Sequence, residues 1–369
     1  MRVLSESPSF PAIAAWSRGR VPGIMEGWPG WAWAWLQLVR AGLVPFSHTR
    51  SRAIYRELSR RLDGIDVSRG EVSLVKGIGA YAVVIAAAAT VDEEFFTLLP
   101  RMYDVWMRSC ESSQKVDVYC GAAGVLLAAA EIEAYLPGSV PRPLVELAHR
   151  RLIAAAQEAL LRRAHRTYLG FAHGFAGHLF ALEMARPVFK LATPRNLLSQ
   201  MLDILESSQW QAPDGAAFWA AAMEEEKIQL TAWCNGSAGI ALALLGCQRF
   251  GMPGMRARYR DLALRALRAT AYRIRSSPTF CCGTIGRAQV LIEAYRQLGD
   301  PVWARSALTI ARTIPADAVE GRRHFRNGTL GAIYLRWRLL HPTALPFPAF
   351  TNISGAAGSQ PAATQNPAG

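Results

Sequence analysis

The sequence predicts an all-α protein whose helical hairpins close into an α/α toroid. Three observations predict this fold: a recurring glycine turn, an apolar segment after each turn, and an arginine-rich amphipathic segment between successive apolar ones. The turn is Gly-x-x-Gly, with a weaker Gly-Ile-Gly version in the first copy. Its first glycines stand 44 to 62 residues apart, at Gly77, Gly121, Gly174, Gly236, Gly283 and Gly328. Periods of this length indicate one supersecondary unit per repeat.

Each turn opens a segment that is apolar on every side and rich in alanine, most clearly at 125–135 and 240–247. A helix without a polar face has to be buried, so we expect these segments to form the inner ring of the toroid. Glycine at the turn permits positive φ and close approach of backbones. All inner helices start at the same end, so their positive dipole ends gather at one mouth and favour thiolates there.

Amphipathic segments lie between the apolar ones and are expected to form the outer ring. In 196–207, leucine and methionine recur at helical spacing; the other such segments are 143–166, 258–275 and 302–314. Hydrophobic residues make up 51% of the chain, enough for one large core. The repeats run without a linker, so we expect one toroid domain. The expected divisions are a tryptophan-rich extension or first helix at 1–49, the toroid at 50–345 and a disordered tail at 346–369.

The stretch 27–38 holds four tryptophans. We interpret it as a first helix packed on the toroid; the alternative is a patch for a membrane interface or a partner. Residues 1–20 lack the continuous apolar core of a signal peptide. The longest apolar stretch, 74–91, contains Lys76 and lies inside the repeats, so no membrane span is expected. We therefore expect a cytoplasmic protein, with peripheral contact to the inner face of the membrane as the alternative.

The net charge of +13 comes almost entirely from arginine. Many arginines lie in the segments assigned to the outer ring, for example Arg150, Arg151, Arg162, Arg163 and Arg166. The simplest interpretation is a solvated helix face, and a basic rim for an acidic peptide is the alternative. We expect no nucleic-acid partner, because the chain carries no nucleic-acid-binding motif.

Potential metal ligands and acid/base groups stand one or two residues before three of the turn glycines. The strings are YLGFAHGFAGHLFAL, WCNGSAGIALALL and CCGTIGRAQVLIEAY, which begin at Tyr168, Trp233 and Cys281. The recurrence of cysteine and histidine at the same place predicts several turns converging on one metal. Without a secretory signal, the six cysteines are not expected to form disulfides.

The other three cysteines are not expected to bind the metal. Cys247 lies further along an inner segment and should be core, and Cys110 should lie on an outer helix or loop. Cys120 precedes Gly121 directly and should lie near the mouth without being a ligand.

The motifs AHGFAG, WCNGSAG and CCGTIG, in this order, resemble the signature motifs of the lanthionine synthetase C-like (LanC-like) proteins over residues 70–340. The resemblance implies an α/α toroid with one zinc ion per chain, held by Cys234, Cys281 and Cys282. It places His173 and Asp117, from DVYCG, in the active site. The implied activity is that of a lanthionine synthetase of the lyase class, as in lantibiotic biosynthesis. A cysteine thiolate of a dehydrated ribosomal precursor peptide adds to dehydroalanine or dehydrobutyrine, which gives a (methyl)lanthionine thioether.

The chain departs from the commonest family pattern at two places. The last ligand motif is Cys-Cys-Gly where Cys-His-Gly is commoner, a form similar to that of some fused bifunctional synthetases. Leu230 and Asn235 stand where stand-alone cyclases often have arginine and tyrosine. The long dehydratase region of the fused enzymes is missing, so the resemblance implies a separate dehydratase partner.

The implied chemistry suits these residue types. Three thiolates leave a fourth, open position on zinc, which lowers the pKa of an incoming thiol. Histidine can take and give a proton near pH 7, so His173 would protonate the enolate. Asp117 would orient that histidine, or would instead be a helix N-cap.

Other functions remain open at this point. The same site could add a free thiol such as glutathione to dehydroamino acids. A zinc-stabilised peptide-binding scaffold without catalysis would need a fourth ligand, such as Cys120 or His173. A toroidal glycosidase needs two opposed carboxylates, but the acidic run 224–226 suits a solvated loop and no pair of acids recurs at the glycine turns. A prenyltransferase-like toroid usually holds its zinc through aspartate, cysteine and histidine.

Overall fold

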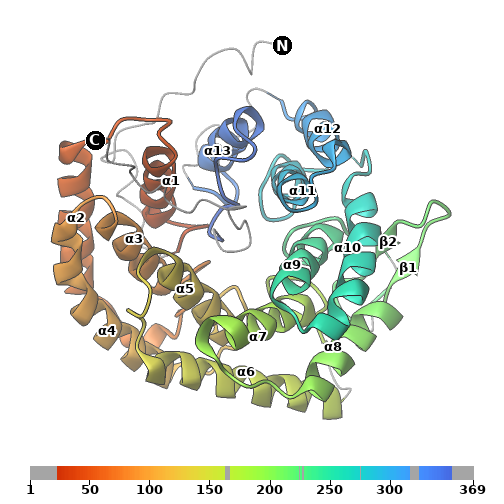
Figure 1. Ribbon diagram of the computed structural model, residues 1–369, viewed down its shortest axis with the longest axis horizontal. Coiled ribbons are helices and arrows are strands. Elements are labelled where there is room, and N and C mark those ends of the chain that lie inside the picture. Colours follow the sequence, from red (N-terminus) through yellow and green to blue (C-terminus); the bar gives the residue numbers. More distant parts are fainter. Residues whose placement is uncertain are drawn as a thin grey trace, which may run out of the picture.

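The computed structural model describes residues 23–162, 167–223, 225–226, 228–274, 276–315 and 324–350. Within these ranges, α-helices alternate along the chain between two concentric rings (Figure 1). The inner ring consists of α1 (Trp28–Arg40), α3 (Gly79–Ala89), α5 (Ala122–Tyr135), α7 (Phe175–Phe189), α9 (Ser237–Phe250), α11 (Thr284–Leu298) and α13 (Thr329–Leu340). The outer ring consists of α2 (His48–Leu62), α4 (Leu99–Ser112), α6 (Arg142–Arg162), α8 (Arg195–Ser207), α10 (Arg256–Thr270) and α12 (Pro301–Ala311). The predicted α/α toroid is therefore confirmed.

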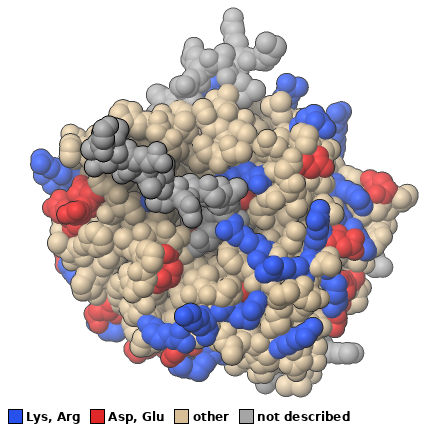
Figure 2. Space-filling model, in the orientation of Figure 1, with Lys and Arg blue, Asp and Glu red and all other residues tan. Residues whose placement is uncertain are grey.

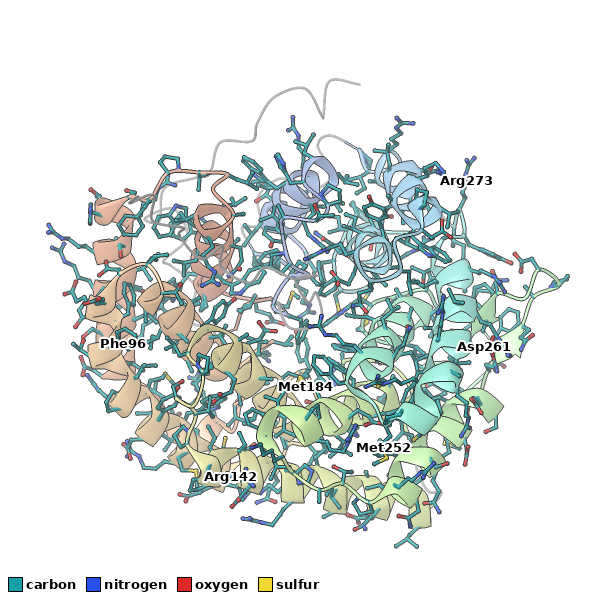
Figure 3. The ribbon with its side chains drawn as sticks, viewed as in Figure 1. Phe96, Arg142, Met184, Met252, Asp261 and Arg273 are labelled. Atoms are coloured by element: carbon teal, nitrogen blue, oxygen red, sulfur yellow. The ribbon has the colours of Figure 1, made fainter. Side chains whose placement is uncertain are left out.

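The inner helices are buried as their composition predicts. Every residue of α3 is buried, and so is almost all of α5. Figure 3 shows the contrast between the rings: Met184 of α7 lies toward the centre, whereas Asp261 of α10 lies at the periphery. Met184 is 1% exposed, and the Asp261 side chain is 61% exposed. Burial of apolar surface, at about 25 cal/mol per Å², is what holds the two rings together.

The outer helices pack through one face. In α8 the buried residues are the leucines and methionine that mark its helical periodicity, namely Leu197, Leu198, Met201, Leu202 and Leu205. In Figure 2, Lys and Arg side chains are spread over the visible face with Asp and Glu between them. This distribution agrees with the interpretation of the arginine-rich segments as solvated faces. Arg163 and Arg166 lie outside the described residues, as does the side chain of Arg162.

Helix α1 takes a place in the inner ring, between α13 and α3 (Figure 1). The ring of Trp33 lies 5.5 Å from that of Tyr334 in α13, and Trp28 stacks on Tyr81 in α3 at 6.0 Å. All four tryptophans of this stretch are at most 1% exposed. They close the toroid, as the first-helix interpretation predicts, and they offer no surface to a membrane. The helix begins with Gly27-Trp28-Pro29-Gly30, a seventh copy of the glycine turn in addition to the six predicted ones.

Smaller elements complete the described structure. Three 3-10 helices, η3 (Val67–Arg69), η4 (Glu93–Leu98) and η5 (Pro253–Met255), lie in connections. Strands β1 (Trp210–Gln211) and β2 (Ala217–Phe218) form an antiparallel hairpin that projects beside α10 (Figure 1). The predicted tail begins at residue 346, but Phe347 and Phe350 are at most 1% exposed and pack inside the toroid. Residues 351–369 and Glu224 lie outside the described residues.

Candidate metal centre and active site

A closed ring of backbone hydrogen bonds joins the seven loops that precede the inner helices. The bonds run from Met25 N to Val75 O, Lys76 N to Tyr119 O, Tyr119 N to Ala172 O, Ala172 N to Cys234 O, Cys234 N to Cys281 O, Cys281 N to Arg326 O and Arg326 N to Met25 O, at 2.9 to 3.3 Å. We call this the mouth ring. It consists of the two residues before the first glycine of each repeat: Met25-Glu26, Val75-Lys76, Tyr119-Cys120, Ala172-His173, Cys234-Asn235, Cys281-Cys282 and Arg326-Asn327.

Close packing, and not positive φ, is why the turns need glycine. Gly174, the N-cap of α7, has φ −127° and ψ −173°, an extended conformation open to any residue. Of the two properties of glycine considered for these turns, the structure uses the close approach of backbones and not positive φ. A Cβ on the second glycine of the next repeat, Gly239, would lie 1.9 Å from the carbonyl oxygen of Trp233. The loop that carries Cys234 thus folds directly over the first turn of its own helix, which fixes that cysteine on the mouth ring.

An apolar layer lies directly beneath the mouth ring. The residue three before the first glycine of each repeat is buried and at most 1% exposed: Ile24, Leu74, Val118, Phe171, Trp233, Phe280 and Phe325. Phe350 packs edge-on against Phe171 at 5.6 Å, and Phe347 against Phe280 at 5.8 Å. The site therefore has an aromatic floor, which keeps water away from its inner side and strengthens electrostatic interactions above it.

Three sulfur atoms meet on the mouth ring. The Sγ atoms of Cys234, Cys281 and Cys282 all lie within 4.8 Å of one another, and those of Cys234 and Cys282 are 3.4 Å apart. Cys281 is buried, Cys234 is half-buried and Cys282 is exposed. These three side chains could hold a metal ion. The exposure of Cys282 leaves the cluster open to the surface on one side.

The hydrogen bonds among the three thiols shift their pKa values in opposite directions. The thiols of Cys234 and Cys281 hydrogen-bond to Cys282 and lower its pKa to about 3, and the Arg326 guanidinium acts in the same direction. Hydrogen bonding to Cys234 and Cys282 raises the pKa of Cys281. The metal-free cluster therefore holds one thiolate readily, whereas a bound cation favours the thiolate form of all three.

His173 and Asp117 form a hydrogen-bonded pair on the neighbouring repeats. His173 Nδ1 lies 2.7 Å from Asp117 Oδ2, and the backbone N–H of Cys120 donates to Asp117 Oδ1 at 2.7 Å. Burial works to raise the pKa of Asp117, but the bonds from His173 and Cys120 outweigh it and the pKa is lowered. Asp117 is therefore a carboxylate at neutral pH, which holds the proton of the imidazole on Nδ1 and leaves Nε2 for proton transfer. The N-cap alternative for Asp117 is wrong, because Gly121 is the N-cap of α5 and no side chain caps it.

A second cluster on the mouth ring was not recognised from the sequence. Arg326 Nη1 donates to the hydroxyl of Tyr119 at 2.9 Å and pairs with the carboxylate of Glu26. Tyr119 also donates to Glu26, and its ring lies 5.2 Å from that of His173. The signal that could have found Tyr119 and Arg326 is their place two residues before a turn glycine, the same place as that of Cys234 and Cys281, whereas Glu26 stands directly before Gly27.

One further histidine lies close to the pair. Burial lowers the pKa of His178 to about 4, with the carboxylate of Asp117 opposing the shift. Its Nε2 is buried without a hydrogen-bond partner, and the side chain is neutral at pH 7. Its place five residues after His173, on the first turns of α7, offered no distinct sequence signal.

The remaining candidates fall where the sequence placed them. Cys247 is buried in α9 and Cys110 is buried in α4. Cys120 lies on the mouth ring but outside the sulfur cluster. Asn235 follows Cys234 on the ring, and its Oδ1 is buried without a partner.

The chain belongs to the family described as "Lanthionine synthetase C-like protein", whose pattern matches residues 20–350. The resemblance seen in the motifs is thereby confirmed at the level of the family. The fold is similar to that of a solved structure titled "Nisin cyclase", with a TM-score of 0.68 and 18% sequence identity over 89% of this chain and 92% of that chain. At this identity the similarity shows a common fold. No curated protein matches the sequence.

The helices of the described ranges were also compared with the dimensions of a bilayer. None of them is both long enough and apolar enough to cross a membrane.

Proposed function

We propose that this protein is a zinc-dependent peptide cyclase, a lanthionine synthetase of the lyase class. Its substrate would be a dehydrated ribosomal peptide, in which a cysteine thiolate adds to dehydroalanine or dehydrobutyrine to form a (methyl)lanthionine. Family membership supports the proposal. The observation that carries it is the convergence of Cys234, Cys281 and Cys282 on the mouth ring that also carries His173, the partner of Asp117.

The sulfur cluster fits a catalytic zinc ion. Tetrahedral zinc with Zn–S distances of about 2.3 Å places its sulfur ligands roughly 3.8 Å apart, and the three Sγ atoms here all lie within 4.8 Å of one another. Three protein ligands leave a fourth position for a substrate, as in catalytic sites. Neither Cys120 nor His173 belongs to the cluster, which argues against a closed structural site. When bound, zinc would supply a lowered pKa for the peptide thiol, so that the thiol reacts as a thiolate at neutral pH.

His173 would donate the proton that completes the addition. The new C–S bond forms at the β-carbon, and the electron pair of the double bond moves to the carbonyl as an enolate. Nε2 of His173 would then deliver a proton to the α-carbon, which replaces the proton lost by the thiol. Asp117 would keep the imidazole in the tautomer that exposes Nε2 and would stabilise its charged form. The aromatic floor would exclude water that competes for the enolate proton.

The proposal implies a partner. The reaction consumes a dehydroamino acid, so serine or threonine must first be dehydrated, and we assign that step to a separate dehydratase. Both enzymes would act in the cytoplasm, where ribosomal precursors are made. The tryptophans of α1 are buried and therefore would not contribute to attachment at a membrane surface.

A synthetic peptide with one cysteine and one dehydroalanine tests the proposal. Cyclisation leaves the mass unchanged but removes the thiol, so a thiol-alkylating probe followed by mass spectrometry separates product from substrate. The zinc-loaded wild type should cyclise the peptide, and Cys234→Ala should not. Cys247→Ala is the matched control, because Cys247 lies in the same repeat but is buried in α9.

Two outcomes of this assay would contradict the proposal. Adducts formed only when glutathione is added would indicate thiol addition in place of cyclisation. A zinc-loaded protein that binds the peptide and forms no thioether would indicate a scaffold.

A further inference from the structure

Arg326 and Tyr119 form a bar across the mouth ring. In the order of the backbone hydrogen bonds, Arg326 belongs to the seventh repeat and Tyr119 to the third, so the ring places them on opposite sides. Their side chains nevertheless meet, with Nη1 2.9 Å from the phenol oxygen. Glu26, in the first repeat, accepts a hydrogen bond from both. Two fixed partners therefore hold the guanidinium in place.

The bar divides the mouth into two unequal parts. The fourth, fifth and sixth repeats lie on one side, and they carry His173, Cys234 and the Cys281–Cys282 pair. The second repeat, with Lys76, lies on the other side, where Lys76 pairs with Glu71 at 3.0 Å. A reacting group held between the sulfur cluster and the histidine would thus face the bar.

One edge of the guanidinium has no partner among the described residues. The hydrogen bonds of this group all use Nη1, and Nε is buried without an acceptor. A buried donor without a partner is costly, and the Nε–Nη2 edge of arginine presents two parallel donors to one oxygen-bearing group. Nε is closed off from solvent and Nη2 is not, so an acceptor that arrives with the substrate would meet this edge at Nη2.

We propose that Arg326 is a catalytic residue that binds the carbonyl oxygen of the dehydroamino acid through this edge and stabilises the enolate. The inference rests on the proposed cyclase function. When the peptide thiolate forms its bond to the β-carbon, the electron pair of the double bond moves onto this oxygen, opposite the donors. The proton then goes to the α-carbon from His173, so that no atom is gained or lost overall. Tyr119 and Glu26 are positioning residues that hold the guanidinium at the required angle.

The geometry also explains why a lysine would be a poor substitute. An ammonium group offers the charge but not two coplanar donors. In addition, the bond from Nη1 to Tyr119 would be lost or moved.

The test compares Arg326→Ala with Lys76→Ala, which removes another cation of the mouth ring, on the other side of the bar. Zinc content and kcat are measured with the cysteine–dehydroalanine peptide at saturation. Loss of a donor to a developing oxyanion typically lowers kcat by about 10² to 10³-fold, and Arg326→Ala should show a loss of this size with full zinc. Lys76→Ala should keep kcat within about 3-fold of wild type, as expected for a residue that gives the transition state no specific donor.

Three further measurements keep the test decisive if the alanine variant is unstable. Arg326→Lys should lose most of the rate although it keeps the charge. Free guanidinium ion, at concentrations far below those that denature, should restore part of the rate of Arg326→Ala but none of that of His173→Ala. Tyr119→Phe should lower kcat by about 10-fold, because the guanidinium loses one of its two anchors.

The outcomes separate the two proposals. A wild-type enzyme that cyclises, with Arg326→Ala equally fast, would overturn the role of Arg326 and leave the cyclase function standing. Loss of zinc together with activity in Arg326→Ala would place the residue at the metal and also overturn the inference. A zinc-loaded wild type that forms no thioether would overturn both.

Discussion

Replacement of Asp117 by asparagine removes a charge while keeping the size of the side chain. The asparagine oxygen can still accept from the backbone N–H of Cys120, now 2.7 Å from Oδ1. Its amide nitrogen then faces His173 Nδ1, which lies 2.7 Å from Oδ2 in the wild type. Two donors cannot share that position, so the imidazole proton moves to Nε2. The atom proposed to take and deliver the proton is then in the wrong state.

The size of the expected effect follows from these contacts. General acid–base catalysis contributes about 10² to 10⁴-fold to a rate, and Asp117→Asn should lose an amount in this range. The lost charged hydrogen bond should destabilise the fold by only about 1 to 2 kcal/mol, the low end for such bonds, because both side chains are partly exposed. The fold and the zinc content should therefore be kept.

The pH dependence provides a second readout for this variant. The pKa of Asp117 is lowered in the folded protein, so its stabilisation is present above its unfolded pKa of about 3.9. That stabilisation is lost as pH falls through the folded pKa. The stability difference between wild type and Asp117→Asn should thus shrink in acid.

The assay is single-turnover thioether formation with zinc-loaded protein, alongside urea unfolding. Asp104→Asn is the control, because Asp104 pairs with Arg108 at 2.8 Å on the exposed face of α4. If Asp117→Asn cyclises within about 3-fold of wild type with full zinc, far inside the range expected for a lost acid–base group, the assignment of His173 as proton donor is refuted.

Two other predictions concern stability. Gly239→Ala should destabilise the protein by about 1 to 3 kcal/mol, typical of overpacking, and should weaken zinc binding. The reason is that its Cβ would lie 1.9 Å from Trp233 O beside Cys234, whereas Gly64→Ala, with open space around it, should be neutral in urea unfolding. Burial lowers the pKa of His178 to about 4, so stability should fall by about 3 kcal/mol as pH drops from 6.5 to 4, and His178→Gln should abolish this dependence. A wild type equally stable at both pH values would contradict the second prediction, and a fully stable Gly239→Ala the first.

The repeat and its chemistry were readable in the sequence because they are local. A buried helix needs an apolar segment, and a loop packed on that helix needs glycine. Both features therefore recur in the sequence of each repeat. Cys234 and Cys281 occupy the same place before their glycines, which predicts their convergence without any knowledge of distances. The outer helices followed in the same way from periodicity.

What the sequence did not reveal depends on closure of the ring. Glu26 and Arg326 are 300 residues apart and meet only because the first and seventh repeats are neighbours. The first repeat itself was missed, because Gly27-Trp28-Pro29-Gly30 opens a tryptophan-rich helix in place of an alanine-rich one. The sequence also left open which property of glycine the turns use. Close approach of two backbones and positive φ both select glycine, and only coordinates distinguish them.

In the proposed function, three thiolates of this chain hold one catalytic zinc ion. Metal analysis combined with X-ray absorption at the zinc edge, on wild type and Cys282→Ala, tests it most directly. We expect about one zinc per chain in the wild type, with three protein sulfurs at about 2.3 Å and a fourth, exchangeable ligand. Cys282→Ala should lose most of the metal. Full zinc retention in that variant, or a fourth protein ligand in the wild type, would contradict the account.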